Sequence, residues 1–172
     1  TPRPELCRGR SPRPPGTPHP PGPMSPAEDR HTVVQIAQTG EWDLPLPFLE
    51  RAILAALRQE EVEEGEISLT FLDDDSIRTL NRDYLGRDRP TDVIVFSLHD
   101  PGDPLVGDIY VGYEQAARQC GAEGVDLREE LIRLTIHGVL HVLGHDHPPG
   151  EDRWSSPMFR LQEEILSTVL HS

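Results

Sequence analysis

The sequence predicts one α/β domain with about four strands and four or five helices, and with a metal site on a long helix in its C-terminal half. A chain of 172 residues has room for one domain with a substantial core and is short for two. From residue 31 onwards, β-branched runs alternate with segments whose apolar residues recur at helical spacing. Histidines then follow at the spacing of metal ligands within an apolar helical segment.

The first half of this region predicts two strands and two helices. Residues 31–38 are rich in β-branched side chains and predict a strand. The segment 47–61 begins with proline, which suits the first turn of a helix, and it continues with apolar residues at amphipathic spacing. Residues 67–73 (ISLTFLD) predict the second strand. A short amphipathic helix follows, for which Asp74 or Asp75 is the expected N-cap.

The second half predicts two strands and three helices. The strands are expected at 91–98 and 107–114, and the helices near 114–120, from Asp126 onwards and at about 155–170. Asp126 followed by Glu129 has the spacing of a capping box, in which each residue bonds a free backbone amide near the other. The helix that starts there is the long one that carries the histidines.

The N-terminal segment differs in composition from the rest. Half of the 18 prolines lie in residues 1–23, which show no apolar periodicity and lack the apolar stretch of a signal peptide. We therefore expect residues 1–23 to be a disordered leader and residues 24–172 to be the folded domain. The net charge is −14, and the leader contributes +3, so the expected domain carries −17. Such a domain has no general attraction for nucleic acid, and any polyanion must meet a local basic patch.

The two cysteines, Cys7 and Cys120, do not form a disulfide framework. No apolar run approaches the ~20 residues needed to span a bilayer. These observations favour a cytoplasmic protein without a membrane partner.

Three histidines form the strongest functional signal. His137 and His141 are four residues apart and share one face of a helix. Gly144 suits a helix C-terminus, where the turn allows His147 to fold back towards the other two. Three imidazoles with an open fourth position are typical of zinc sites that leave room for water or substrate. One Zn²⁺ per chain is the expected cofactor, although nickel or copper would bind such a site too.

His145 is the alternative third ligand. It lies four residues after His141, so an unbroken helix would place it on the ligand face. Termination at Gly144 favours His147 as the ligand and turns His145 away, to line the cleft or to contact a ligand.

The spacing is also similar to the metzincin protease motif H-E-x-x-H-x-x-G-x-x-H. Those proteases use the glutamate after the first histidine as general base, and Gly138 stands at that place here. A peptidase is therefore the weakest of the functions considered.

Two longer segments identify the family that the sequence resembles. HGVLHVLGHDH (137–147) resembles the signature H-G-x-L-H-L-x-G-Y-D-H of the YbeY family of bacterial endoribonucleases, with differences at Val142 and His145. LNRDYLGRDRPTDVIVFS (80–97) is similar to a second block of that family, and GDIYV (107–111) matches a third, weaker one. The resemblance covers about residues 31–170.

The resemblance implies a mixed sheet, a zinc ion on His137, His141 and His147, and metal-dependent cleavage of RNA. It also implies maturation of the 3′ end of small-subunit ribosomal RNA and a role in ribosome quality control. The partners it implies are ribosomal RNA, the small ribosomal subunit and an assembly GTPase.

One departure from the family concerns the basic residues of the second block. Leu85 stands where the family commonly has an arginine that serves activity, so that role is not transferred. Arg82, Arg87 and Arg89 remain as candidates for phosphate contact, because guanidinium matches phosphate geometry. The alternative is that they pair with Asp83 and Asp88 on a solvated face.

The chemistry remains open at two points. The metal can activate water or polarise a phosphoryl oxygen for attack by the ribose 2′-OH. Asp146, Asp92 and Ser97 are candidates beside the cleft, and none is assigned as the base. Besides a ribonuclease, the sequence allows a ribosome-assembly factor whose metal holds the C-terminal helices in place.

Overall fold

A computed structural model describes residues 32–172, apart from the side chain of Glu151. The predicted leader at 1–23 lies outside the described residues, as do residues 24–31 at the start of the predicted domain. No helix in the described part is long and apolar enough to cross a membrane.

The centre of the fold is a mixed sheet of four strands, as the family resemblance implied. The strands are β1 (Thr32–Gln38), β2 (Gly65–Leu72), β3 (Val93–Ser97) and β4 (Leu105–Gly112), in the spatial order β1-β2-β4-β3. β1, β2 and β4 run parallel, and β3 pairs antiparallel with β4 at the edge. The predicted strands are confirmed, and each begins or ends within two residues of its expected position.

Five α-helices accompany the sheet in the described chain. They are α1 (Leu46–Gln59), α2 (Asp74–Leu85), α3 (Tyr113–Glu123), α4 (Leu127–Val142) and α5 (Pro157–Leu170), and a 3₁₀ helix, η1 (Gly150–Ser155), precedes α5. α3 runs three residues beyond its predicted end and stops at Gly124, where φ is +69°. η1 was not predicted as a separate element.

Two predicted helix caps are wrong in detail. Asp73, one residue before the expected pair, caps α2 by accepting a hydrogen bond from the amide of Ser76 at 2.8 Å. Asp126 caps α4 as expected, with the amide of Arg128 at 2.9 Å. However, Glu129 does not complete a capping box, because its carboxylate binds Arg133 at 3.1 Å instead.

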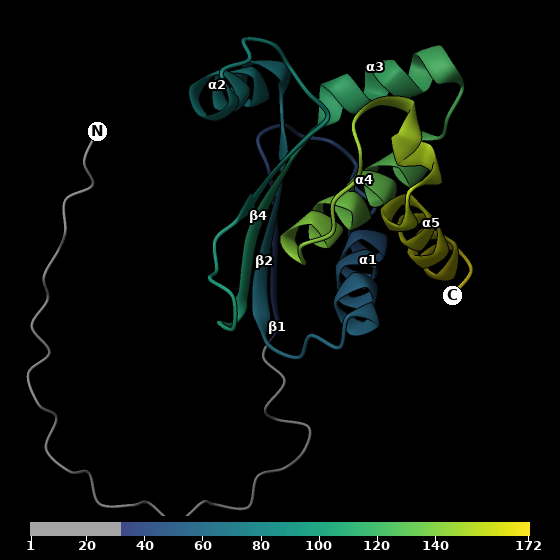
Figure 1. Cartoon of the computed structure of the whole chain (residues 1–172). Coiled ribbons are helices and arrows are strands. Elements are labelled where there is room, and N and C mark those ends of the chain that lie inside the picture. Colours follow the sequence, from purple (N-terminus) through teal and green to yellow (C-terminus); the bar gives the residue numbers. More distant parts are fainter. Residues whose placement is uncertain (1–31) are drawn as a thin grey trace, which may run out of the picture.

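α4 lies against β3 and β4 on one face of the sheet, and α1 and α5 pack against α4 (Figure 1). Its apolar residues are buried between β4, α1 and α5, which explains a helical segment that is apolar on nearly all sides. Two glycines allow the close approach to β4. A Cβ on Gly107 would lie 2.5 Å from the side chain of Val142, and one on Gly138 would lie 2.6 Å from Ile109.

The opposite face of the sheet is covered at one end by α2. A smaller apolar cluster joins this helix to the sheet through Leu72, Ile77 and Ile94. α2 therefore stands on the other side of β3 and β4 from α4, and the loop after it leads into β3.

Candidate metal centre

The predicted histidines meet at the C-terminal end of α4. The Nε2 atoms of His137 and His141, one helical turn apart, are 3.0 Å from each other. α4 ends at Val142, and Gly144 adopts φ +97°, which turns the chain so that His147 returns to the pair. One ligand atom from each of the three lies within 4.8 Å of the others, so His137, His141 and His147 can hold one metal ion.

Hydrogen bonds fix which ring nitrogens face the site. The Nδ1 of His137 lies 2.7 Å from Oε1 of Gln162 on α5, and the Nδ1 of His147 lies 3.0 Å from the carbonyl oxygen of Pro148. Because both partners are acceptors, both Nδ1 atoms carry the proton, and the Nε2 atoms keep their lone pairs for a metal. Neutral imidazoles with directed Nε2 atoms are the donor set that a transition metal needs.

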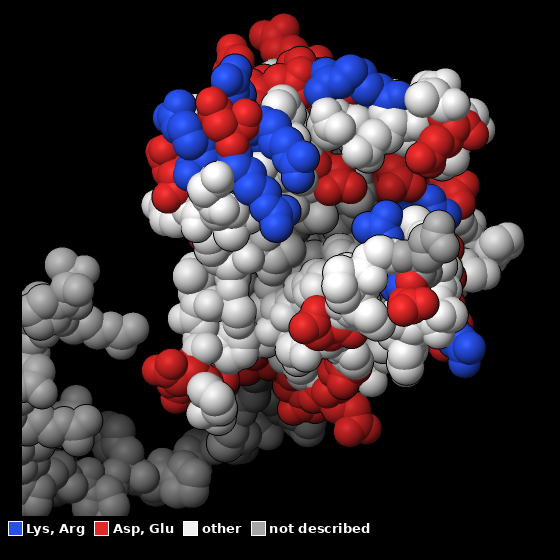
Figure 2. All heavy atoms as spheres, turned by 45° about the horizontal axis from the view of Figure 1, so that its top comes forward, with Lys and Arg blue, Asp and Glu red and all other residues white. Residues whose placement is uncertain are grey.

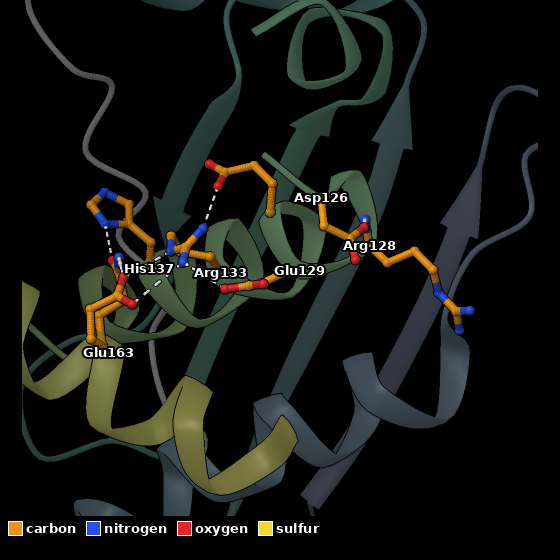
Figure 3. Close-up of polar contacts among 8 residues, drawn as sticks. Asp126, Arg128, Glu129, Arg133, His137 and Glu163 are labelled. Carbon is orange, nitrogen blue, oxygen red and sulfur yellow. Dashed lines mark hydrogen bonds and ion pairs between the residues drawn. The ribbon is translucent and has the colours of Figure 1, made fainter. Parts of the chain in front are cut away.

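An ion-pair network holds Gln162 in place. Gln162 is only 4% exposed, and its Nε2 donates to Oε1 of Glu163 at 3.3 Å. Glu163 in turn binds Nε of Arg133 at 2.8 Å, and Arg133 also binds Glu130 at 2.6 Å. Figure 3 shows Arg133 between α4 and α5, with His137 reaching α5 beside it. The guanidinium thus links the helix of the ligands to the helix that orients them.

Electrostatics keep this cluster in its metal-binding form. Burial, followed by the neighbouring His141, lowers the pKa of His137 from 6.5 to about 4. Burial also lowers the pKa of His141, assisted by His147 and opposed by the carboxylate of Asp146. Burial opposes the charge of Arg133, but its bonds to Glu163 and Glu130 outweigh that effect and raise its pKa. Near neutral pH, His137 and His141 are therefore neutral and Arg133 is charged.

The depressed pKa of His137 predicts that the metal-free protein loses stability in mild acid. Below pH 6.5 the unfolded chain takes up a proton at this residue, whereas the folded chain does so only near pH 4. The free energy of unfolding should therefore fall as pH falls from about 6.5 to about 4, by on the order of 3 kcal/mol. Urea unfolding of chelator-treated protein at several pH values measures this. In the His137→Asn variant, the free energy of unfolding should depend less on pH between about 6.5 and about 4. An unchanged pH dependence would show that His137 is not the group responsible.

His145 does not join the ligands, as the predicted helix end at Gly144 requires. Its Nε2 binds Oε1 of Glu60, just after α1, at 2.5 Å. Asp146 accepts a hydrogen bond from the amide of His147 at 2.8 Å. Asp146 thus fixes the backbone of the turn, and His145 anchors that turn to α1.

Gly138 is needed for packing at the position of the metzincin glutamate. The space beside it is filled by Ile109 on β4, so a side chain here would meet the sheet. The general base of those proteases therefore has no place at this point of α4.

A methyl group is enough to test this contact. Gly138→Ala should lower the free energy of unfolding by about 1–3 kcal/mol, because a buried Cβ would force Ile109 to shift. Gly121, exposed on α3 with open space around its Cα, is the matched control. Gly121→Ala should be neutral or stabilising by about 0.5–1 kcal/mol. Equal effects of the two substitutions in denaturant titrations would refute the packing argument.

The three predicted phosphate-binding arginines lie at the end of α2 and in the loop after it, and all three are exposed. Figure 2 shows basic side chains gathered over this part of the molecule. Arg82 pairs with Asp83 at 3.1 Å, as the alternative reading expected. Asp88, however, is bound by Arg78 at 2.8 Å. Arg87 and Arg89 have no side-chain partner within residues 32–172 and remain available for an anion.

A buried asparagine shapes this loop. Asn81 is 2% exposed, and its side-chain Nδ2 donates to the backbone carbonyl oxygen of Arg89 at 2.9 Å. The backbone carbonyl oxygen of Asn81 accepts a hydrogen bond from the backbone amide of Arg87 at 3.3 Å. The backbone that carries both free guanidinium groups is thereby fixed to α2.

A pocket of about 320 Å³ opens beside the histidines. Its wall includes His137 and His147, and also Asp92 just before β3, as the sequence suggested for that aspartate. Ser97 lies at the other end of β3, where its hydroxyl contacts Nδ1 of His99 at 3.4 Å, so it does not border the pocket.

Gln162 and Arg133 contribute to the site without having been predicted. Gln162 follows His137 by 25 residues and lies on a separate helix. No local pattern marks either residue. Gln162 could have been noticed only as a polar residue at a position that the amphipathic pattern of α5 assigns to its buried face.

The fold and the site together define an α/β domain in which three histidines, on one helix and the turn after it, can hold a metal ion. The family model described as Endoribonuclease YbeY matches residues 44–170. The chain therefore belongs to the YbeY endoribonuclease family, which confirms the resemblance seen in its motifs.

Individual relatives agree with this. The chain is 35% identical to an Endoribonuclease YbeY of Persephonella marina, over 77% of this chain and 88% of that one. It is 39% identical to the Thermus thermophilus protein of the same name, over 71% and 89% of the two chains. A solution structure from Thermotoga maritima matches with a TM-score of 0.59 and 26% identity, covering 81% of this chain and 90% of the other.

Proposed function

We propose that this protein is a zinc-dependent endoribonuclease that cuts single-stranded RNA. The observation that carries the proposal is the cluster of His137, His141 and His147 in a chain whose relatives are named endoribonucleases. Zinc suits three neutral imidazoles with an open position. An unpaired base of a splayed single strand can enter the pocket beside α4, from which a duplex is excluded by its width.

Each group of the chain has a distinct task in this proposal. When bound, the ion supplies Lewis-acid activation of water or of a phosphoryl oxygen. His137, His141 and His147 hold it, and Gln162 keeps the Nε2 of His137 directed at it. Arg87 and Arg89 bind backbone phosphates of the substrate, because their guanidinium groups are exposed and have no side-chain partner among residues 32–172.

We further propose that the substrate is ribosomal RNA, cut at the 3′ end of the small-subunit molecule and during quality control in the cytoplasm. The net charge of −14 makes the whole chain a poor binder of free RNA, so affinity must come from a partner. The small ribosomal subunit and an assembly GTPase are the partners that the family resemblance implies. Tight binding of isolated RNA at physiological salt would argue against this dependence.

The test is cleavage of a labelled single-stranded RNA by metal-analysed protein. Cleavage should stop in chelator and return when zinc is restored, while circular dichroism shows the fold unchanged. Activity that survives chelation would refute metal dependence. Unfolding in chelator, without RNA cleavage beforehand, would favour an assembly factor with a structural metal. Digestion of casein would favour the peptidase.

The free arginines predict a specific salt dependence of RNA binding. Arg87→Gln and Arg89→Gln should each weaken binding irrespective of base sequence, and each should reduce the slope of log affinity against log salt by about 0.7. Arg128→Gln is the matched control, because Arg128 is exposed and points away from the Arg133 network in Figure 3. Equal effects of all three substitutions would show a general charge effect instead of phosphate contact.

A further inference from the structure

The pocket beside the histidines is lined mostly by residues other than the three histidines. It is bordered by α3, α4, η1 and α5, and only two of its wall residues, His137 and His147, are metal ligands. About 320 Å³ is at the small end of ligand pockets, which suits one ring system better than a length of chain. A group that enters it would lie directly beside the proposed zinc site.

One side of the pocket is a surface for stacking. Trp154 is 54% exposed and meets the ring of Phe159 edge to face, with centroids 5.1 Å apart. The guanidinium of Arg153 lies 4.4 Å from the centroid of the indole. Leu134 and Met158 add buried apolar surface to the same wall. Indole and guanidinium planes are the groups on which proteins stack unpaired bases of RNA.

The polar groups of the pocket are of both signs, because Asp92, Glu123 and Glu130 carry carboxylates and Arg133 and Arg153 carry guanidinium groups. Gln119 and Glu123 project from α3, and within the described chain their side chains make no hydrogen bond or ion pair. Asp92 faces the pocket from just before β3. Adenine, cytosine and guanine carry an exocyclic amino group that donates to carboxylates, whereas uracil carries none.

We propose that this pocket binds a single nucleobase of the RNA, next to the phosphate that is cut, and that it favours adenine, cytosine and guanine over uracil. The base stacks on Trp154 and Arg153 and donates its amino group to Glu123 or Asp92. The phosphate stays outside, near the histidines. The inference rests on the proposed ribonuclease function, which it extends to the choice of base.

Binding can be measured without cleavage, because the chain has two tryptophans. In ¹⁵N-labelled full-length protein, the indole N–H signal of Trp154 should shift on titration with AMP, CMP or GMP. Trp42 is stacked on Tyr113, with the ring centroids 4.4 Å apart, and its indole N–H signal is an internal reference that should not shift. UMP should bind about tenfold more weakly, because it lacks the exocyclic amino group and can offer the carboxylates only its ring N3–H. Ribose 5-phosphate, which has no base, should not shift the signal.

Variants separate stacking from base choice. Trp154→Ala should weaken AMP binding by at least about fivefold, followed on other pocket resonances, and Trp154→Phe should retain most of it. Glu123→Gln should narrow the difference between UMP and CMP, because an amide can also donate. Equal binding of UMP, a shift caused by ribose 5-phosphate, or an unaffected Trp154→Ala variant would each overturn the proposal. Nucleotide binding in a protein that cuts no RNA would instead remove the ribonuclease function and leave the pocket assignment standing.

Discussion

His141→Ala should abolish zinc binding at stoichiometric concentrations and lower RNA cleavage at least about a hundredfold. The substitution removes one of three ligand nitrogens, and Lewis-acid stabilisation by a bound ion is worth several kcal/mol in the transition state. Zinc content by atomic absorption and initial rates on a labelled oligonucleotide measure the two effects. The fold should survive, because the imidazole of His141 is only partly buried.

His145→Ala is the matched control for this prediction. His145 is four residues further along the chain, but it contacts Glu60 and lies outside the ligand cluster. Its removal should leave zinc content and cleavage within about twofold of wild type, since a partly exposed surface pair of this kind is worth about 1 kcal/mol or less. Equal cleavage by wild type and His141→Ala would indicate that activity resides elsewhere or in a contaminant. Loss of zinc in His145→Ala alone would reverse the ligand assignment.

Gln162→Leu should weaken zinc binding by about 10- to 100-fold, although Gln162 is not a ligand. The substitution removes the acceptor for Nδ1–H of His137, which is 2.7 Å away, so the ring loses the bond that fixes its orientation. Competition with a chromophoric chelator gives the affinity. A second effect distinguishes orientation from simple packing. Gln162→Glu supplies a charged acceptor, so it should keep the zinc affinity near neutral pH. Because a carboxylate beside His137 favours the protonated ring, the pH below which zinc is lost should be higher than in wild type.

The matched control for Gln162 is its exposed neighbour Glu164 on the same helix. Glu164→Gln removes a charge from α5 without touching His137, so zinc affinity should stay within about twofold of wild type. Comparable losses in Gln162→Leu and Glu164→Gln would mean that any substitution on α5 disturbs the site and that the bond from Gln162 to His137 has no special part in it. An unchanged affinity in Gln162→Leu would show that the ring of His137 is held by other contacts.

The clustering of the three histidines could be predicted from sequence because its geometry is local. A separation of four residues places His137 and His141 on one helix face, and Gly144 supplies the positive φ that ends the helix. The distinction between His145 and His147 depends on that same turn. All three ligands lie within residues 137–147, so helical periodicity and one turn were sufficient.

The surroundings of the ligands could not be predicted, because they depend on how the helices pack. Gln162 meets His137 only because α5 lies against α4, and Arg133 joins both helices. The same competition explains the error at Glu129, which had the spacing of a capping residue but binds Arg133. A long-range ion pair prevailed there over a local capping rule.

The three histidines are close in sequence, whereas Gln162, which holds His137, comes from a later helix, so the site forms in two stages. The ligands can assemble as soon as α4 and its turn have formed, because closing so short a loop is fast. The bond from Gln162 comes only when the C-terminal helix docks, since no earlier part of the chain carries it. During synthesis, a nascent chain that ends before α5 would exchange zinc quickly with its surroundings, and docking of α5 would slow that exchange. In the zinc-loaded protein proposed above, the residence time of zinc should therefore report how often α5 opens.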